Sequence, residues 1–353
     1  MKIIMPSDPA LRYQGRIGRK NPNAPEFYWS GSSVTFGFTG KYLSVCIENF
    51  KNYHVSKLGY VLDGILYQFT LTSCTDAPEE YVIPVSEGGV HSFTLYKRQD
   101  DPHYFKLRGI SIADDAEVIT VPSDQKLKLE FFGDSVTSGA VCELNDYVGQ
   151  LDPIPYDSVY DDAWQSYAMQ TARLLNAEVH LVSQGGIALL DGTGYFAYGE
   201  YGMESVYDKL CYLPSAPCMT EWDFSLYQPD VVVFAIGQND HHIGEDDVEE
   251  LAADARKYWL SRYTAIIRDL MEKYPDARFV LMLTILCHSE YWEALLDEAC
   301  EMIGDARVMR FRFKRSGIGT PGHPRIAEHQ EMACELSEWI HTKMNRHGDS
   351  AVR

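Results

Sequence analysis

The sequence predicts two domains: an all-β sandwich over residues 1–123, followed by an α/β domain with a doubly wound parallel sheet over residues 124–353. The length of 353 residues is about twice that of an average domain. Short β-like segments separated by turn residues fill the first part of the chain. Beyond Pro122, apolar strands alternate with amphipathic helices, which is typical of an α/β domain.

The first domain is defined by short segments rich in β-branched and aromatic residues. Residues 34–47 form one such stretch. Residues 59–71 form another, with Asp63-Gly64 near the middle, a pair typical of a two-residue hairpin turn. Residues 81–85 and 91–96 continue the pattern. Because no good helix lies between these segments, we expect an all-β sandwich.

In the second domain, strands and helices follow one another. The strand over residues 230–236 is strongly apolar, which is typical of the buried middle of a parallel sheet. Residues 192–221 are rich in Gly, Tyr and Pro without a clear period, so we expect a long functional loop there. The remaining predicted strands cover residues 126–132, 178–183 and 278–284, and the predicted helices cover residues 162–175, 247–274 and 324–343.

The charge balance excludes several classes of partner. The chain carries 31 basic and 51 acidic residues, a formal net charge of −20. An acidic surface repels phosphate backbones and anionic membranes, so we expect neither a nucleic-acid nor a membrane partner. No segment approaches the roughly 18 apolar residues of a membrane span, and the N-terminus shows no signal-like apolar run. We therefore expect a soluble, cytoplasmic protein.

The cysteines and histidines do not form a metal-binding pattern. The eight cysteines are scattered without a Cys-x-x-Cys pair, so we expect free thiols and no zinc site. Cys287 follows an apolar run, which predicts a buried strand position. His241 and His242 are consecutive and cannot share a helix face, so a solvated acidic helix start accounts for them better than a metal site. His329 and His341 are expected on the surface of the last helix.

Four short blocks carry the candidate chemistry. Gly133-Asp134-Ser135 follows the first strand of the second domain, Gly185-Gly186 the second and Gly237-Gln238-Asn239-Asp240 the third. His323 opens the last helix. Each block alone is also ordinary turn chemistry. Together they supply a nucleophile, a base and oxyanion donors at the edge where open α/β sheets bind ligands, which is a complete set for acyl transfer.

The order Gly-Asp-Ser, Gly, Gly-x-Asn-Asp, His-Pro resembles the SGNH (GDSL-type) hydrolases. The likeness extends to carbohydrate esterase family 2, which joins an N-terminal jelly-roll sandwich to an SGNH domain. The supporting stretches are Gly15-Arg16, Trp29-Ser-Gly-Ser, Tyr96-Lys-Arg-Gln-Asp, residues 130–139, Ser166-Tyr-Ala and residues 222–233.

The resemblance implies a role for each residue of the four blocks. Ser135 resembles the nucleophile and His323 the base, while Asn239 and Gly186 resemble the oxyanion donors, with Gly185 adjacent should the alignment shift by one. It implies no cofactor and no metal.

One departure concerns the base. SGNH hydrolases often carry an Asp two or three residues before the His, where this chain has Pro321 and Thr320. In family 2 a Ser-His dyad is known, with a backbone carbonyl holding the imidazole. The resemblance therefore implies a dyad here.

The leading hypothesis is an esterase that removes acetyl groups from xylo- or manno-oligosaccharides through an acetyl-enzyme. A lipase or thioesterase of the GDSL type is one alternative, and it requires an apolar groove for a long acyl chain. A catalytically inactive carbohydrate-binding protein is the other. The Tyr- and Gly-rich residues 195–212 favour a polar ligand that can stack on aromatic rings.

Overall fold

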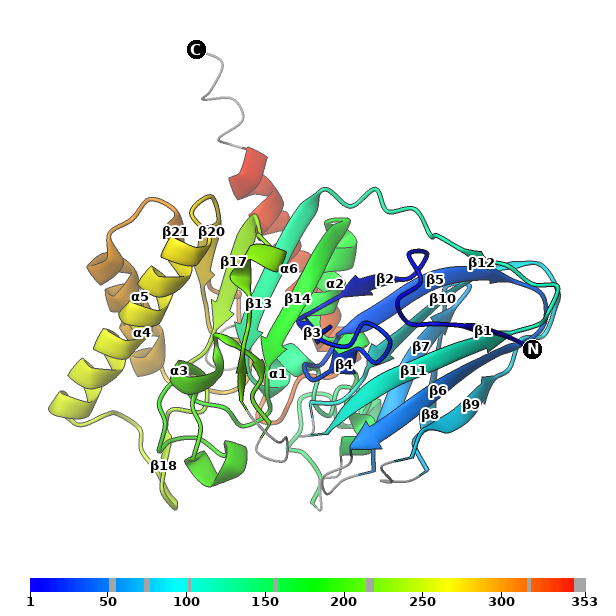
Figure 1. Cartoon of the computed structure of the whole chain (residues 1–353). Coiled ribbons are helices and arrows are strands. Elements are labelled where there is room, and N and C mark those ends of the chain that lie inside the picture. Colours follow the sequence, from blue (N-terminus) through cyan, green and yellow to red (C-terminus); the bar gives the residue numbers. More distant parts are fainter. Residues whose placement is uncertain are drawn as a thin grey trace, which may run out of the picture. The chain divides into compact units, whose positions relative to one another are not determined.

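The computed structural model describes residues 1–50, 55–72, 77–100, 103–154, 158–213, 219–315 and 319–345. It divides into two compact units (Figure 1). The first unit contains Met1–Asp124 together with Asp157–Val159 and Lys209–Trp222, and the second contains the rest of the chain. Both short segments come from the part that the sequence assigns to the second domain. The predicted fold class, antiparallel sheets followed by a parallel α/β domain, is confirmed.

Two antiparallel sheets build the first unit. The first sheet contains β1 (Lys2–Ile4), β3 (Ile17–Gly18), β4 (Glu26–Phe27), β6 (Leu43–Phe50), β9 (Glu79–Ile83) and β11 (Tyr104–Ile112). The second contains β2 (Arg12–Gln14), β5 (Ser33–Thr39), β7 (Lys57–Leu62), β8 (Ile65–Thr70), β10 (Val90–Lys97) and β12 (Val118–Ile119). Phe36 and Phe93 of the second sheet share one buried core with Val45 and Leu107 of the first.

The local sequence explains the hairpins of this unit. The predicted turn at Asp63-Gly64 joins β7 to β8, and both residues have positive φ angles, 51° and 82°, as a type I′ turn requires. Residues 34–47, predicted as one stretch, form two strands instead. The chain turns between β5 and β6 at Gly40, whose φ of 99° suits glycine.

The second unit contains a five-stranded parallel sheet in the order β14-β13-β17-β20-β21. These strands are β13 (Leu127–Gly133), β14 (Ala177–Ser183), β17 (Val231–Ala235), β20 (Arg278–Leu281) and β21 (Val308–Arg310). The chain starts at β13, moves to β14 at one edge, and then returns to build the other side from β17 onward. Such a reversal leaves a crevice at the carboxyl ends of the strands, where open sheets of this kind bind ligands.

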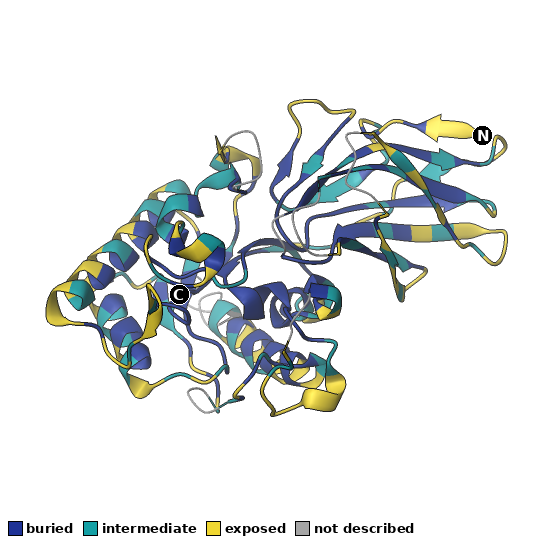
Figure 2. Ribbon diagram, turned by 90° about the horizontal axis from the view of Figure 1, so that it is seen from below, coloured by how far each residue is buried: buried dark blue, intermediate teal, exposed yellow. Residues whose placement is uncertain are grey.

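Helices cover both faces of the parallel sheet. Phe131 and Val233 belong to a buried cluster with residues of α2 (Tyr167–Leu174) and α6 (Ile326–Asn345). On the opposite face, Phe132 and Phe234 lie beside each other, and Phe234 contacts Tyr263 of α4 (Ala253–Lys273). Helix α5 (Glu290–Ile303) packs against α4. Figure 2 shows the buried strands and the exposed outer faces of the helices.

The chain also contains short elements outside these layers. They are α1 (Ser135–Ser138), α3 (Met203–Val206), β15 (Lys209–Cys211), β16 (Thr220–Glu221), β18 (His242–Ile243), β19 (Asp246–Asp247), and the 3-10 helices η1 (Asn145–Tyr147), η2 (Ser158–Tyr160), η3 (Ala163–Gln165), η4 (Phe196–Gly199) and η5 (Phe224–Leu226). Several of them interrupt the segment that the sequence predicts as a long loop over residues 192–221. Among the described residues, none of the helices has the length and apolarity needed to cross a membrane.

Several local predictions were wrong. The helix predicted from residue 247 begins at Ala253, because Asp246 and Asp247 pair with His242 and Ile243 in a short β-ribbon. Helix α5 and strand β21 were not predicted. Cys287 lies beyond the end of β20 and is exposed rather than buried in a strand. The six cysteines among the described residues are free thiols.

Candidate active site

Ser135 stands at the point where β13 ends and α1 begins. The Asp134 side chain caps this short helix by accepting a hydrogen bond of 3.0 Å from the backbone N–H of Val136. Gly139, with a φ of 75°, ends the helix after a single turn. The serine is 8% exposed, so the rest of the chain covers most of its surface.

His323 joins the serine to a carboxylate. Its Nε2 lies 2.8 Å from Ser135 Oγ, and its Nδ1 lies 2.6 Å from Asp152 Oδ2. The backbone N–H of His323 also donates to Asp152 Oδ1 over 3.2 Å. A carboxylate at Nδ1 keeps the imidazole proton on that nitrogen and leaves Nε2 free to accept the serine proton.

The predicted dyad is therefore corrected, because a carboxylate rather than a backbone carbonyl holds the imidazole. Asp152 lies 171 positions before His323 in the sequence, so no local motif links the two residues. The segment carrying Asp152 reaches the histidine because Gly322 leaves room for it. A Cβ atom at Gly322 would lie 2.5 Å from Gln150 O and 2.9 Å from Asp152 Oδ1.

The charge of Asp152 is set by its neighbours. Partial burial alone would raise the pKa of this carboxyl, but hydrogen bonds and positive charge from His323 and Arg325 hold the pKa at about 2. Arg325 is fully buried and donates to Asp152 Oδ1 over 2.6 Å. Asp152 is consequently ionised at neutral pH and stabilises positive charge on the imidazole.

Asn239 follows β17 and faces the same edge of the sheet. Its side chain is fixed because Nδ2 donates to the backbone oxygen of Ile187 over 2.9 Å. An amide carries two N–H groups, so one remains for a ligand. The buried Asp240 braces this loop by accepting hydrogen bonds from Leu189 N at 3.0 Å and Trp259 Nε1 at 2.7 Å.

Gly186 follows β14 and is tied to the Asn239 loop through its neighbour Ile187. Its φ of 74° favours glycine, and a Cβ atom here would lie 2.9 Å from Tyr195 Cβ. Within the part of the chain that the structure describes, the backbone N–H groups of Gly185 and Gly186 have no intramolecular acceptor. Both are therefore available to a ligand, and Gly186 stays the predicted donor.

The four predicted site residues thus all lie on segments next to the carboxyl ends of strands or at the start of α6. The structure directly joins Ser135 to His323 and links the Gly186 and Asn239 loops through Ile187. Asp152 and Arg325 were missed by the sequence analysis. The dipeptide Asp152-Pro153 is only a common turn signal.

The other histidine candidates have structural explanations. His242 Nδ1 lies 2.7 Å from Asp247 Oδ1, and the ring stacks on Tyr195 at a centroid distance of 3.9 Å. No group of three or more potential metal ligands occurs among the described residues. His329 is fully buried, contrary to the surface position predicted, and its Nδ1 accepts a hydrogen bond of 3.0 Å from Tyr167 N. His341 is exposed, as predicted.

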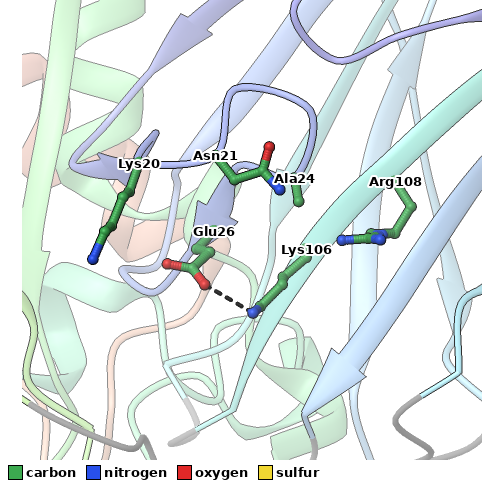
Figure 3. A pocket seen from close by; sticks show the side chains of 6 residues that line it. All are labelled: Lys20, Asn21, Ala24, Glu26, Lys106 and Arg108. Carbon is green, nitrogen blue, oxygen red and sulfur yellow. Dashed lines mark ion pairs between the residues drawn. The ribbon is translucent and has the colours of Figure 1, made fainter.

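A separate hollow of about 300 Å³ lies on the first unit (Figure 3). Its charged groups partly neutralise one another, since Lys106 Nζ lies 2.9 Å from Glu26 Oε1. The lining residues are Lys20, Asn21, Ala24, Glu26, Lys106 and Arg108. None of these side chains offers a nucleophile paired with a base, so we assign the chemistry to the Ser135 site.

Residues 131–352 match the model of the GDSL-like lipase/acylhydrolase family, and residues 13–122 match the carbohydrate esterase 2 N-terminal model. The chain belongs to the GDSL-like lipase/acylhydrolase family. The predicted membership of the SGNH hydrolases is confirmed, and so is the prediction of an ester hydrolase at the level of this family.

The similarity to known proteins extends over nearly the whole chain. Cellulase/esterase CelE of Acetivibrio thermocellus is 29% identical over 96% of this chain, which spans only 40% of the length of CelE. Acetylxylan esterase/glucomannan deacetylase of Cellvibrio japonicus is 26% identical, over 97% of this chain and 91% of the relative. A solved family two carbohydrate esterase from Clostridium thermocellum, in complex with cellohexaose, is 26% identical with a TM-score of 0.77, over 95% of this chain and 99% of that one.

Proposed function

We propose that this chain is a carbohydrate O-acetyl esterase that acts on acetylated xylo- or manno-oligosaccharides. The observation that carries the proposal is the hydrogen-bond chain from Asp152 through His323 to Ser135. It supports a serine nucleophile with an oriented base. The choice of a sugar ester is supported by the names of the relatives, which include an acetylxylan esterase/glucomannan deacetylase and an esterase solved with cellohexaose.

Acylation begins with the serine. Ser135 Oγ attacks the acetyl carbonyl carbon while His323 Nε2 takes the hydroxyl proton. The carbonyl oxygen becomes an oxyanion, and the free N–H of the Asn239 amide and the backbone N–H of Gly186 donate to it. As the tetrahedral intermediate collapses, the ester C–O bond breaks and His323 gives its proton to the departing sugar oxygen.

Deacylation repeats these steps with water. His323 takes a proton from the water as its oxygen attacks the acetyl-enzyme, and then returns a proton to Ser135 Oγ as acetate leaves. Asp152 holds the Nδ1 proton throughout and offsets the charge of the imidazolium that forms in each half-reaction. Every proton is carried by groups of the chain itself, so this sequence of steps calls for no cofactor.

The test is acetate release from acetylated xylo- and manno-oligosaccharides by the wild-type protein and by Ser135→Ala. Release by the wild type that disappears in Ser135→Ala and persists in the exposed control Ser261→Ala is the expected result. A correctly folded wild type that releases no acetate from either sugar would overturn the proposed substrate. A series of p-nitrophenyl esters of increasing acyl length distinguishes the lipase alternative, because a lipase should favour longer acyl groups.

A further inference from the structure

Arg325 is a fully buried guanidinium two residues beyond His323, just before α6. One of its terminal nitrogens donates to Asp152 Oδ1 over 2.6 Å, and the other donates to the backbone oxygen of His323 over 2.6 Å. A single side chain therefore holds both the carboxylate and the main chain of the residue that the carboxylate orients.

This contact divides the two oxygens of Asp152 between two tasks. Oδ1 accepts from Arg325 and Oδ2 accepts from the imidazole Nδ1, while the backbone N–H of His323 is shared between the two oxygens at 3.2 and 3.3 Å. A planar guanidinium has its donors at fixed angles and so sets the orientation of a carboxylate better than an ammonium group does. Burying such a charge is unfavourable unless it is paired, and the Asp152 carboxylate supplies the opposite charge for Arg325.

The arginine is itself anchored from α6. Its backbone N–H donates to Glu328 Oε2 over 3.0 Å, and the other carboxylate oxygen of Glu328 contacts Arg315 at 3.2 Å. The main chain of Arg325 is thus tied to the start of the helix, while Asp152 lies on a separate segment after η1. Apart from Arg325, only His323 holds the Asp152 carboxylate within the described residues. The rotamer of Asp152 therefore depends on its contact with Arg325.

We propose that Arg325 is a positioning residue of the reaction, which fixes the Asp152 carboxylate with Oδ2 against His323 Nδ1 and acts on catalysis through Asp152. The inference rests on the ester-hydrolase step of the proposed function and is independent of which sugar is deacetylated. It gives the buried arginine a purpose beyond stability, because the loss of Arg325 alters the base without touching the substrate.

Two further titratable groups among the described residues, Asp134 and His329, lie near His323. Both are fully buried, and both interact electrostatically with His323. Burial, with the nearby His323 and Arg325, lowers the pKa of His329 to about 3, so this ring is neutral at neutral pH. Asp134 is occupied in capping α1. Asp152 is therefore the carboxylate through which Arg325 reaches the imidazole.

A double-mutant cycle tests the proposal, with p-nitrophenyl acetate as substrate and kcat and KM measured separately. Arg325→Met should lower kcat about 10²-fold, the scale for a small misplacement of catalytic groups, with KM changed less than about twofold. In the Asp152→Asn background, Arg325→Met should lower kcat less than about threefold, because the carboxylate through which Arg325 acts is already absent. Arg325→Lys should recover part of the loss. Equal losses in both backgrounds would overturn the proposal.

Arg268→Met is the matched control, since Arg268 also donates to a main-chain carbonyl, Met302 O at 2.7 Å, but lies in α4. It should leave kcat unchanged. If Arg325→Met fails to fold, the cycle is run with Arg325→Lys and Arg325→Gln. We expect kcat to fall less in Arg325→Lys than in Arg325→Gln, and the reverse order would refute the positioning role of Arg325.

The same double-mutant cycle can be measured without an acyl substrate. Its readout is then the rate at which diethyl p-nitrophenyl phosphate modifies Ser135, followed by mass spectrometry. Non-additive labelling rates in a protein that releases no acetate from sugars would support Arg325 while refuting the proposed substrate. A wild-type protein that is not labelled at Ser135 would refute both, because the inference needs an activated serine.

Discussion

Replacement of Asp152 by asparagine tests whether the base works with or without a carboxylate. The carboxylate accepts from Arg325 and the His323 backbone at Oδ1 and from His323 Nδ1 at Oδ2, the last over 2.6 Å. Asparagine offers one acceptor and one NH₂ group. With its oxygen toward Arg325, its NH₂ faces Nδ1, which must then accept. The imidazole proton moves to Nε2, and this nitrogen can no longer take the proton of Ser135.

The expected loss follows from this change of tautomer. Asp152→Asn should lower kcat roughly 10³–10⁴-fold, the scale for loss of the orienting carboxylate in serine hydrolases. At 1.36 kcal/mol per factor of ten, this is about 4–5.5 kcal/mol of transition-state stabilisation. Because interactions with His323 and Arg325 hold the pKa of Asp152 at about 2, the wild-type carboxylate stays ionised across the assay range, so the difference should persist from pH 5 to pH 8.

The assay is steady-state hydrolysis of p-nitrophenyl acetate, with far-UV circular dichroism and a thermal melt to confirm folding. Asp146→Asn serves as the control, since Asp146 is an exposed carboxylate in η1, six positions earlier. A folded Asp152→Asn protein that keeps more than about a tenth of wild-type kcat would refute the reasoning. It would restore the dyad that the family resemblance implies.

Three further predictions concern other parts of the site. Asn239→Ala should lower kcat about 10²–10³-fold with little change in KM, as for loss of one oxyanion donor, and a loss under tenfold in steady-state assays would place the oxyanion hole elsewhere. Gly322→Ala should lower kcat about 10²-fold, because the added Cβ would lie 2.5 Å from Gln150 O and displace Asp152; unchanged kinetics would show that the segment adapts. Burial raises the pKa of Asp240 from 3.8 to about 7, so the folded state keeps a proton that the unfolded state has lost, and stability should fall as pH rises between these values. In urea melts from pH 4 to pH 7, Asp240→Asn should reduce the fall in the free energy of unfolding by up to about 1.4 kcal/mol per pH unit. Identical slopes of this free energy against pH for the two proteins would contradict the raised pKa of Asp240.

Much of the fold could be predicted because its signals are local. The turn at Asp63-Gly64 needs positive φ angles that this dipeptide tolerates, and its hairpin is present as expected. The apolar strand over residues 230–236 is buried in the middle of the parallel sheet as β17. The start of α4 was misjudged because acidic residues suit a helix N-terminus, but Asp246 and Asp247 are taken up by a β-ribbon with His242 and Ile243.

The sequence by itself determined the order of the domains and the identity of the blocks at Ser135, Gly186, Asn239 and His323, because these depend on short-range turn chemistry and on where each strand stops. Only the tertiary structure decided what orients the imidazole. Asp152 is 171 positions from His323 in the chain, and no periodicity or spacing in the sequence indicates a contact between two segments so far apart. The same holds for Arg325 and His329, whose burial depends on what packs around the start of α6 and not on their own sequence neighbourhood.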